Sequence, residues 1–457
     1  MPQLNEGLAE VLPDVLLTGV FSSKREAKFM SVSTFIQRQI AQIRQYGYPV
    51  VARKLKYVLS VLLMLPLHIP AVPVVLMLRL IRPWLLVRCG RLNSGAIGHF
   101  AGNTELYLCE RDAGINLPKQ RHVDLFYMPK PICNNQLAAM WKRVLHVWPV
   151  WILAPISRVN RLIPGGAVHE IGNNTQADRD VHNLLDRLPS HLQFTADEEA
   201  RGKSGLRDMG IPPDTRFVCL NVRDSAYRSF FTPGGDFSYH NYRDSDIQNY
   251  VPAAEELANR GYFVIRTGAK VNEAMKTNHP RVIDYAFNGM RSDFMDIYLG
   301  AKCEFCISTG TGWDDVPEMC RRPIVFVNYL PVGYFLTHRK EFIYLTKHHI
   351  GKEGRELTLE EIFSRGVGFS LSTSDYESKG VQLMENTPEE IRDVVIEMVE
   401  RLNGAWQPHD DDEDLQRLFW EIFPADAINV QNGRPLHGEV RARFGAAFLR
   451  NNRDWLK

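Results

Sequence analysis

This sequence lacks an excess of either positive or negative charge. Its 457 residues include 54 lysines and arginines against 53 aspartates and glutamates, for a formal net charge of +1. A balance this even gives the chain no global attraction to nucleic acid or to acidic polymers, so we expect no nucleic-acid partner. Internal repeats and low-complexity tracts are absent as well. Binding partners must therefore be argued from local sites.

Cysteine is scarce and shows no pairing pattern. The seven cysteines are odd in number and stand mostly inside apolar, strand-like runs, which favours reduced, buried thiols and a cytosolic location for the folded part. Cys303 and Cys306 form a CxxC, but no second pair or neighbouring histidine completes a metal site. Their segment also resembles a strand, whereas a redox CxxC opens a helix. We therefore expect core cysteines and no metal site.

We expect no signal peptide, because the first residues include Glu6 and Glu10 and lack a basic start with an apolar core. Farther on, the segment 57–78 is uncharged and long enough for a span of about 20 residues, but its prolines would kink a helix in lipid. Basic residues flank it on both sides, which predicts that both ends stay cytoplasmic. We expect 1–90 to be a helical, membrane-associated segment that contacts a membrane surface through 57–78. The alternative is a buried helical hairpin in a soluble domain.

The rest of the chain has a globular composition, with 45% apolar and 23% charged residues, and its length allows two or three domains. Strand and helix patterns alternate over 91–210, which predicts a first α/β lobe followed by a linker. Within it we expect strands at 105–109 and 123–128 and a helix at 134–145. A glycine-rich loop at 95–102 precedes them.

The alternation is clearer over 211–375. Near-continuous apolar strands separated by helices indicate a parallel sheet covered on both faces, so this segment is predicted to be a Rossmann-like second lobe. The expected strands are 217–222, 262–266, 282–285, 304–308 and 324–328. Residues 376–457 are predicted to form C-terminal helices, at 387–402 and 412–423, that pack back across the lobes.

The loops that follow these strands carry candidate ligands, because open α/β sheets bind beyond the carboxyl ends of their strands. A loop of small residues before a helix leaves backbone N–H groups free for a phosphate, and arginine forks suit a diphosphate. Together these segments predict a diphosphate cradle. Its candidate residues are Arg223, Arg266, Gly268, Ser308, Thr309, Gly310, Thr311 and Gly312.

Each of these residues also has a purely structural interpretation. The glycines could serve only to make turns, and Arg223 and Arg266 could form surface ion pairs. Glu318, one turn into the helix after the small-residue loop, could accept both ribose hydroxyls of a nucleotide. It could equally well favour the helix N-terminus by its charge alone.

Five segments in order resemble a family of bacterial glycosyltransferases, and two tail segments, 380–391 and 444–451, resemble that family's closing pattern. The resemblance covers roughly 90 to 455. The five segments are 219–224 (CLNVRD), 240–247 (HNYRDSDI), 262–268 (YFVIRTG), 282–285 (VIDY) and 308–312 (STGTG).

The resemblance implies a GT-B fold, in which two Rossmann-like lobes face a cleft, with a nucleotide-sugar donor in the second lobe. It also implies a glycan or lipid-linked acceptor and a role in surface polysaccharide assembly at the cytoplasmic face of the inner membrane, peripheral or monotopic. Arg223 is similar to the strand-end arginine of protein O-fucosyltransferase-like enzymes. Their full paired-arginine motif is missing here, so a GDP-fucose donor is not implied.

The catalytic base of a GT-B enzyme comes from the acceptor lobe, which makes His99 and Glu105 the candidates, with Asp224 and His240 as alternatives. Gly95 and Gly98 would then belong, with His240, to the acceptor-side loop. Each candidate could instead cap or pair locally. No DxD pair stands at a strand end, so we expect metal-independent chemistry without a cofactor; the pair at 314–315 argues weakly against this.

Two other functions compete with this one. A nicotinamide-dependent oxidoreductase would need GxGxxG after the first strand of a βαβ unit, but the glycines at 95–102 have the wrong spacing and those at 310–312 lack the third glycine. A non-catalytic membrane-bound scaffold with the same fold is the second alternative, and the strand-end arginines argue against it.

Overall fold

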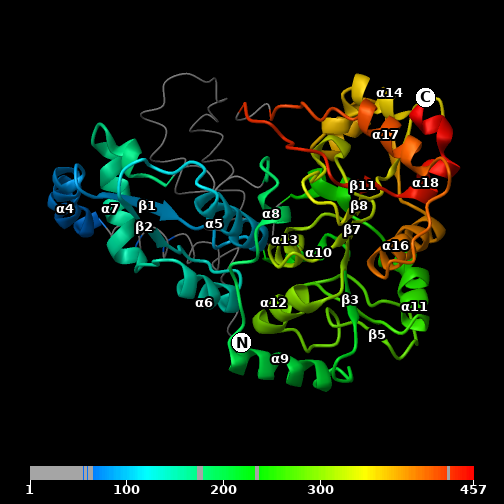
Figure 1. Ribbon diagram of the computed structural model, residues 1–457, viewed down its shortest axis with the longest axis horizontal. Helices are drawn as coiled ribbons and strands as arrows, with labels where there is room; N and C mark the ends of the chain where they lie inside the picture. Colours follow the sequence, from blue (N-terminus) through cyan, green and yellow to red (C-terminus); the bar gives the residue numbers. More distant parts are fainter. Residues whose placement is uncertain (1–54, 56–58, 60–64, 172–178, 232–235, 430–432) are drawn as a thin grey trace.

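The computed structural model describes residues 55, 59, 65–171, 179–231, 236–429 and 433–457 (Figure 1). Most of the predicted membrane-associated segment, including 60–64 of its apolar stretch, lies outside these residues. The described part is an α/β protein with a large parallel sheet, as the sequence predicts. Helices and shorter strands form the remainder.

The second lobe contains a seven-stranded sheet in the order β11-β8-β7-β6-β3-β4-β5, and its strands pair in parallel throughout. The five predicted strands are confirmed, since each contains one of the observed strands. Two further strands were not predicted. The strands are β3 (Phe217–Asn221), β4 (Phe263–Arg266), β5 (Val282–Ile283), β6 (Cys306–Ser308), β7 (Ile324–Phe326), β8 (Phe342–Tyr344) and β11 (Arg443–Phe444).

Helices cover the two faces of this sheet. Helix α11 (Val251–Asn259) packs on α16 (Pro388–Leu402), and α12 (Asp293–Lys302) packs on α9 (Ala196–Asp208). Figure 1 shows the two pairs on opposite sides of the strands. α16 begins with a capping box between Thr387 and Glu390, which satisfies the backbone donors of its first turn. α16 confirms the helix predicted at 387–402.

The C-terminal segment completes the second lobe. α17 (Asp412–Ile422) and α18 (Ala446–Asn451) pack on each other, and α18 also packs on α16. Between them, β11 joins the edge of the sheet beside β8, with Phe444 opposite Tyr344. A two-residue strand carries no periodicity of its own, so only this tertiary pairing defines it.

The first lobe is smaller than the Rossmann-like fold that the sequence predicts. Among the described residues, its sheet consists of β1 (Leu86–Arg91) and β2 (His122–Tyr127) in parallel, extended by single bridges to Glu170 and Val147. α6 (Asn135–Val144) confirms the predicted helix at 134–145. β2 likewise confirms the strand predicted at 123–128.

The strand predicted at 105–109 is wrong, because these residues lie in α5 (Thr104–Asp112). Every residue from Thr104 to Glu110 is buried, so the apolar positions follow no helical period that the sequence could show. The predicted glycine-rich loop is also largely helical, since a π-helical turn, η2 (His99–Asn103), leads directly into α5.

Two helices stand beside the small sheet, at the end of the molecule farthest from the seven-stranded sheet (Figure 1). α4 (His68–Ile81) packs on α7 (Val150–Leu162), and Ala71 and Val75 meet Val159 between them. Among the described residues, we find no helix with the length and apolarity that a membrane crossing requires.

Candidate functional site

The strand order of the large sheet creates a switch point. The chain runs outward from β3 through β4 and β5, then crosses to β6, β7 and β8 on the other side of β3. In open parallel sheets, ligands bind beyond the carboxyl ends of the strands at such a point. The segments that leave β3 and β6 meet there, since Thr311 Oγ1 donates to Asn221 Oδ1 at 2.9 Å. The candidate site is therefore the edge of the sheet between these two strands.

Arg223 lies directly at the switch point. Its backbone N–H donates to Thr309 Oγ1 at 2.9 Å, which ties the end of β3 to the end of β6. Its Nε donates to Asp244 Oδ1 at 3.1 Å, and the side chain remains 15% exposed. Burial raises the pKa of the Asp244 carboxyl even though the Arg223 charge acts in the opposite direction. The Arg223 guanidinium is thus held in place and still reachable from solvent.

A second arginine at this point was missed by the sequence analysis. Arg243 ends the 3-10 turn η5 (Ser238–Arg243), and its Nη2 donates to the carbonyl oxygen of Gly310. Its Nε is buried and has no hydrogen-bond partner among the described residues. The one signal in the sequence is that Arg243 falls within the segment 240–247 that carries the family resemblance. Two guanidinium groups, from β3 and η5, therefore flank the switch point.

Lys347 adds a third cation, also missed, at the end of β8. Its Nζ donates to the backbone oxygen of Asp244 at 2.6 Å and lies 3.8 Å from Glu385 Oε1. Burial lowers the pKa of this ammonium, and the charges of Glu385 and Asp244 oppose that shift. Lys347 fixes the backbone beside the arginine pair and is itself only 6% exposed through its side chain.

The small-residue loop after β6 does not offer the free donors that the sequence predicts. The turn that follows it, η7 (Gly312–Asp314), is closed by a capping box in which Thr311 N donates to Asp314 Oδ2 at 2.5 Å. Gly310 N donates to Ser308 Oγ at 3.2 Å. The next helix, α13 (Asp315–Met319), has five residues, and its start is acidic. In this form side chains hold the N–H groups of Gly310 and Thr311, and the acidic start of α13 disfavours anions, so the structure gives no support to the predicted phosphate-binding helix terminus.

Asp314 is the centre of that capped loop. Its Oδ1 accepts hydrogen bonds from Ser308 Oγ at 2.5 Å and from Thr311 Oγ1 at 3.0 Å. Burial raises the pKa of its carboxyl to about 7, although these hydrogen bonds and the charge of Arg243 act to lower it. Ser308 and Thr311 thus serve the conformation of the loop and are not exposed ligands in this form.

Two further predicted donor ligands are buried in ion pairs. Arg266 is 1% exposed, and its Nη1 donates to Asp284 Oδ2 at 3.0 Å and to the backbone oxygen of Glu273 at 2.6 Å. Glu318 is 3% exposed and pairs with His338 Nε2 at 2.7 Å. Buried in these pairs, neither side chain offers the exposed nucleotide ligand that the sequence predicts. Gly268, which follows Arg266 by two positions, has a φ of 154° that favours glycine.

The two glycine-rich segments of the sequence meet each other. A Cβ on Gly98 would lie 2.5 Å from Asp315 Oδ2 and 2.9 Å from the carbonyl oxygen of Gly312, and one on Gly102 would lie 2.5 Å from Asp315 Oδ1. These glycines therefore allow the backbone of η2 to approach η7 and α13 closely. The part of the segment 95–102 around Gly98 and Gly102 is therefore a contact between the lobes that borders the loop after β6.

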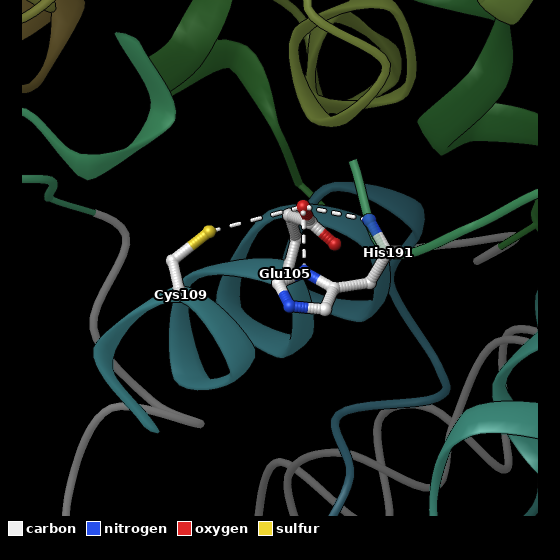
Figure 2. A group of neighbouring side chains, drawn as sticks. All are labelled: Glu105, Cys109 and His191. Atoms are coloured by element: carbon white, nitrogen blue, oxygen red, sulfur yellow. Dashed lines mark hydrogen bonds and ion pairs between the residues drawn. The ribbon is translucent and has the colours of Figure 1, made fainter. Parts of the chain in front are cut away.

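Glu105 belongs to a different cluster, which joins the lobes behind this contact. Figure 2 shows it with Cys109 on α5 and with His191. His191 Nδ1 lies 3.1 Å from Glu105 Oε1, and Arg321 from the second lobe donates to the same oxygen through Nη2 at 2.6 Å. Glu105 is fully buried, so it cannot meet an acceptor hydroxyl. The structure contradicts its predicted role as a base and makes it an ionic link between the lobes.

The same cluster has the residue types of a metal site, since Glu105, Cys109 and His191 place their ligand atoms within 4.8 Å of one another. Arg321, however, donates to Cys109 Sγ at 3.4 Å as well as to Glu105. Burial raises the pKa of the Cys109 thiol to about 12, which keeps it protonated at neutral pH. A guanidinium already occupies the position that a cation would take.

The remaining candidate bases differ in exposure and in the groups they contact. His99, the first residue of η2, is exposed, and its Nδ1 lies 3.5 Å from Asn103 Oδ1. Asp224 accepts backbone hydrogen bonds from Ala226 at 2.9 Å and from Asn272 at 2.8 Å, which orders the loops around the switch point, and its role as a base stays a prediction. His240 is half-buried and stacks on Tyr239 at 4.0 Å between ring centroids. Of the four predicted bases, His99 is the most accessible.

Comparison with known proteins adds little to this geometry. No family model matches the chain, and no curated protein matches its sequence. Among solved structures, a glycosyl transferase family 9 protein from Veillonella parvula has a TM-score of 0.38 and 12% identity, over 57% of this chain and 86% of its own.

Two further structures show the same level of similarity. E. coli ADP-heptose LPS heptosyltransferase II has a TM-score of 0.39 and 14% identity, over 69% of this chain and 98% of its own. An E. coli heptosyltransferase in complex with ADP-2-deoxy-2-fluoro heptose has a TM-score of 0.25 and 11% identity, over 53% and 89%. At such scores the similarity supports no conclusion about activity, which rests on the site itself.

Proposed function

We propose that this protein is a glycosyltransferase of the GT-B class that transfers a sugar from a nucleotide-sugar donor. The main support for this proposal is the pair Arg223 and Arg243. These arginines follow β3 and end η5, respectively, and flank the switch point of the parallel sheet. Two fixed guanidinium groups at that position suit the diphosphate of such a donor, because each can form paired hydrogen bonds with phosphate oxygens. The family resemblance of the segments around both arginines supports the same function.

In this proposal the first lobe holds the acceptor, a glycan or lipid-linked hydroxyl compound used in bacterial surface polysaccharide assembly. His99 is exposed and directly follows Gly98, which contacts the second lobe at Gly312. The imidazole takes the proton of the acceptor hydroxyl, and the oxygen attacks the anomeric carbon of the donor. The bond from that carbon to the diphosphate breaks, and Arg223 and Arg243 stabilise the departing charge. The chemistry as proposed uses no metal and no cofactor.

Nucleotide binding tests the donor site. We would measure the thermal unfolding of the wild type with UDP, GDP, CMP, ADP, dTDP and NAD, and repeat the measurement with Arg223→Ala, Arg243→Ala and the control Arg417→Ala. Arg417 is 66% exposed on α17, far in sequence from the site. We expect one nucleoside diphosphate to raise the unfolding temperature of the wild type and the control. Each site variant should lose about tenfold in affinity.

The outcomes separate the candidate functions. Stabilisation by NAD alone would favour an oxidoreductase, and binding that survives both site substitutions would place the nucleotide elsewhere. If no nucleotide binds, the donor site is refuted. With a donor identified, His99→Ala should abolish transfer while leaving nucleotide binding unchanged; full transfer by this variant would remove His99 as the base.

A further inference from the structure

The surface of α4 and α7 exposes large apolar side chains at the end of the first lobe. On α4 these residues recur every three or four positions, opposite the buried Ala71 and Val75 that face α7. Soluble surfaces rarely gather so many apolar side chains without a partner. The most exposed members define the α4–α7 surface, and they are Ile69 (76% exposed), Leu76 (54%), Leu80 (73%), Trp84 (73%), Trp151 (57%) and Leu162 (73%).

The sequence around α4 and α7 is mainly basic. Between residues 65 and 104 the sequence has no aspartate or glutamate and four arginines, and between 125 and 169 it has no acid and five basic residues. These two stretches contain α4 and α7. Glu170 pairs with Arg161 of α7 at 2.8 Å, so the border of this apolar face is mainly but not wholly basic. Such a face complements the anionic headgroups of a bilayer.

The lengths of the helices determine how they can meet a bilayer. α4 has 14 residues, which corresponds to about 21 Å of helix and is short of the roughly 30 Å hydrocarbon core. Pro73 lies inside it, and Trp84 follows it with 73% of its surface exposed. Exposed tryptophans prefer the depth of the headgroups. These features suit a helix pair that lies in the interface, with the polar remainder of the protein in water.

We propose that the α4–α7 surface binds an anionic lipid bilayer and lies flat in its headgroup region. This assigns the contact to two helices, where the sequence indicated only the single stretch 57–78. It is independent of the donor site, because α4 and α7 stand at the opposite end of the first lobe from the seven-stranded sheet (Figure 1). Bound in this way, the protein keeps its second lobe exposed to soluble ligands.

Vesicle co-sedimentation of the full chain tests this inference. The wild type is mixed with vesicles of phosphatidylcholine alone or with phosphatidylglycerol added, and compared with Leu80→Glu, Trp151→Glu and the control Leu418→Glu. Leu418 is 39% exposed on α17. We expect anionic vesicles to bind the wild type and the control. Either surface variant should bind about tenfold more weakly, since a carboxylate enters an apolar, anionic interface.

Several results would overturn the proposal. They are equal binding of all four proteins, no binding of the wild type, and equal binding to both kinds of vesicle. A wild-type dimer that Leu80→Glu dissociates would instead assign this surface to a second copy of the chain. Thermal unfolding with and without the nucleotide identified above checks that each variant folds and keeps its donor site, so a failure of membrane binding is distinguished from a failure of the glycosyltransferase proposal.

Discussion

At the scale of single residues, position at a strand end proved informative, and burial decided which side chains are available. Arg223 and Arg266 both end apolar strands, yet only Arg223 remains partly exposed. The partner of Arg266 is Asp284, 18 residues later in the chain, and no local pattern shows that the two will pair. Arg243 was missed for the opposite reason, because it follows no strand. Sequence patterns locate the sheet edge well, but the pairing of its charges depends on tertiary contacts.

Substitution of Glu105 tests whether its buried ion pair with Arg321 stabilises the fold. Glu105 is fully buried, with the guanidinium of Arg321 2.6 Å from its Oε1, so Glu105→Gln leaves that cation without its counter-charge. We expect the free energy of unfolding to fall by about 2–4 kcal/mol, as measured by urea denaturation, with nucleotide binding by the folded protein unchanged. The control Glu413→Gln breaks an ion pair with Arg443 in which the glutamate is 66% exposed, and it should cost under about 1 kcal/mol. Unchanged stability together with lost sugar transfer would restore Glu105 as a catalytic base.

At the scale of elements, helices with caps and long apolar strands could be predicted, whereas short or fully buried elements could not. Thr387 and Glu390 are a capping-box pattern that predicts where α16 begins, and the observed helix begins directly after Thr387. α5 is buried on all sides and was predicted as a strand. The glycines at 98 and 102 were predicted as a loop, but they serve a helix that must approach another element closely. Spacing alone does not distinguish these uses of glycine.

The contact between η2 and α13 gives a matched pair of substitutions. Gly102→Ala places its Cβ 2.5 Å from Asp315 Oδ1, and Gly98→Ala meets both that carboxylate and the carbonyl oxygen of Gly312 at 2.9 Å. We expect each to lower the free energy of unfolding by about 1–3 kcal/mol. In an Asp315→Ala background, Gly102→Ala should regain its stability, because the atoms that crowd it are gone. Gly98→Ala should not, because backbone remains in its way. Equal recovery in both would show that the contact differs from this geometry.

At the scale of the whole molecule, the first and second lobes share one hydrophobic core. Phe100 and Trp141 of the first lobe belong to the same buried cluster as Phe294 and Val316 of the second. Polar contacts also join the two lobes, since Asn134 Nδ2 donates to the backbone oxygen of Asp293 at 2.9 Å. The sequence predicts two lobes and a linker but does not show how extensively the lobes pack. A core of this continuity is typical of a single folding unit.

We therefore expect calorimetry of the full chain to show one cooperative transition, although chains of this length commonly unfold in stages. Two cap substitutions examine this. Asn134→Ala removes the acceptor for Leu137 N at the start of α6 and also the donor to the backbone oxygen of Asp293 across the lobes, whereas Thr358→Ala removes the acceptor for Glu361 N within the second lobe. Each loss of a cap is worth about 1 kcal/mol. Because the lobes unfold together, both variants should shift the same transition to lower temperature. Two separate transitions, each shifted by only one of the variants, would show that the lobes are thermodynamically independent despite their common core.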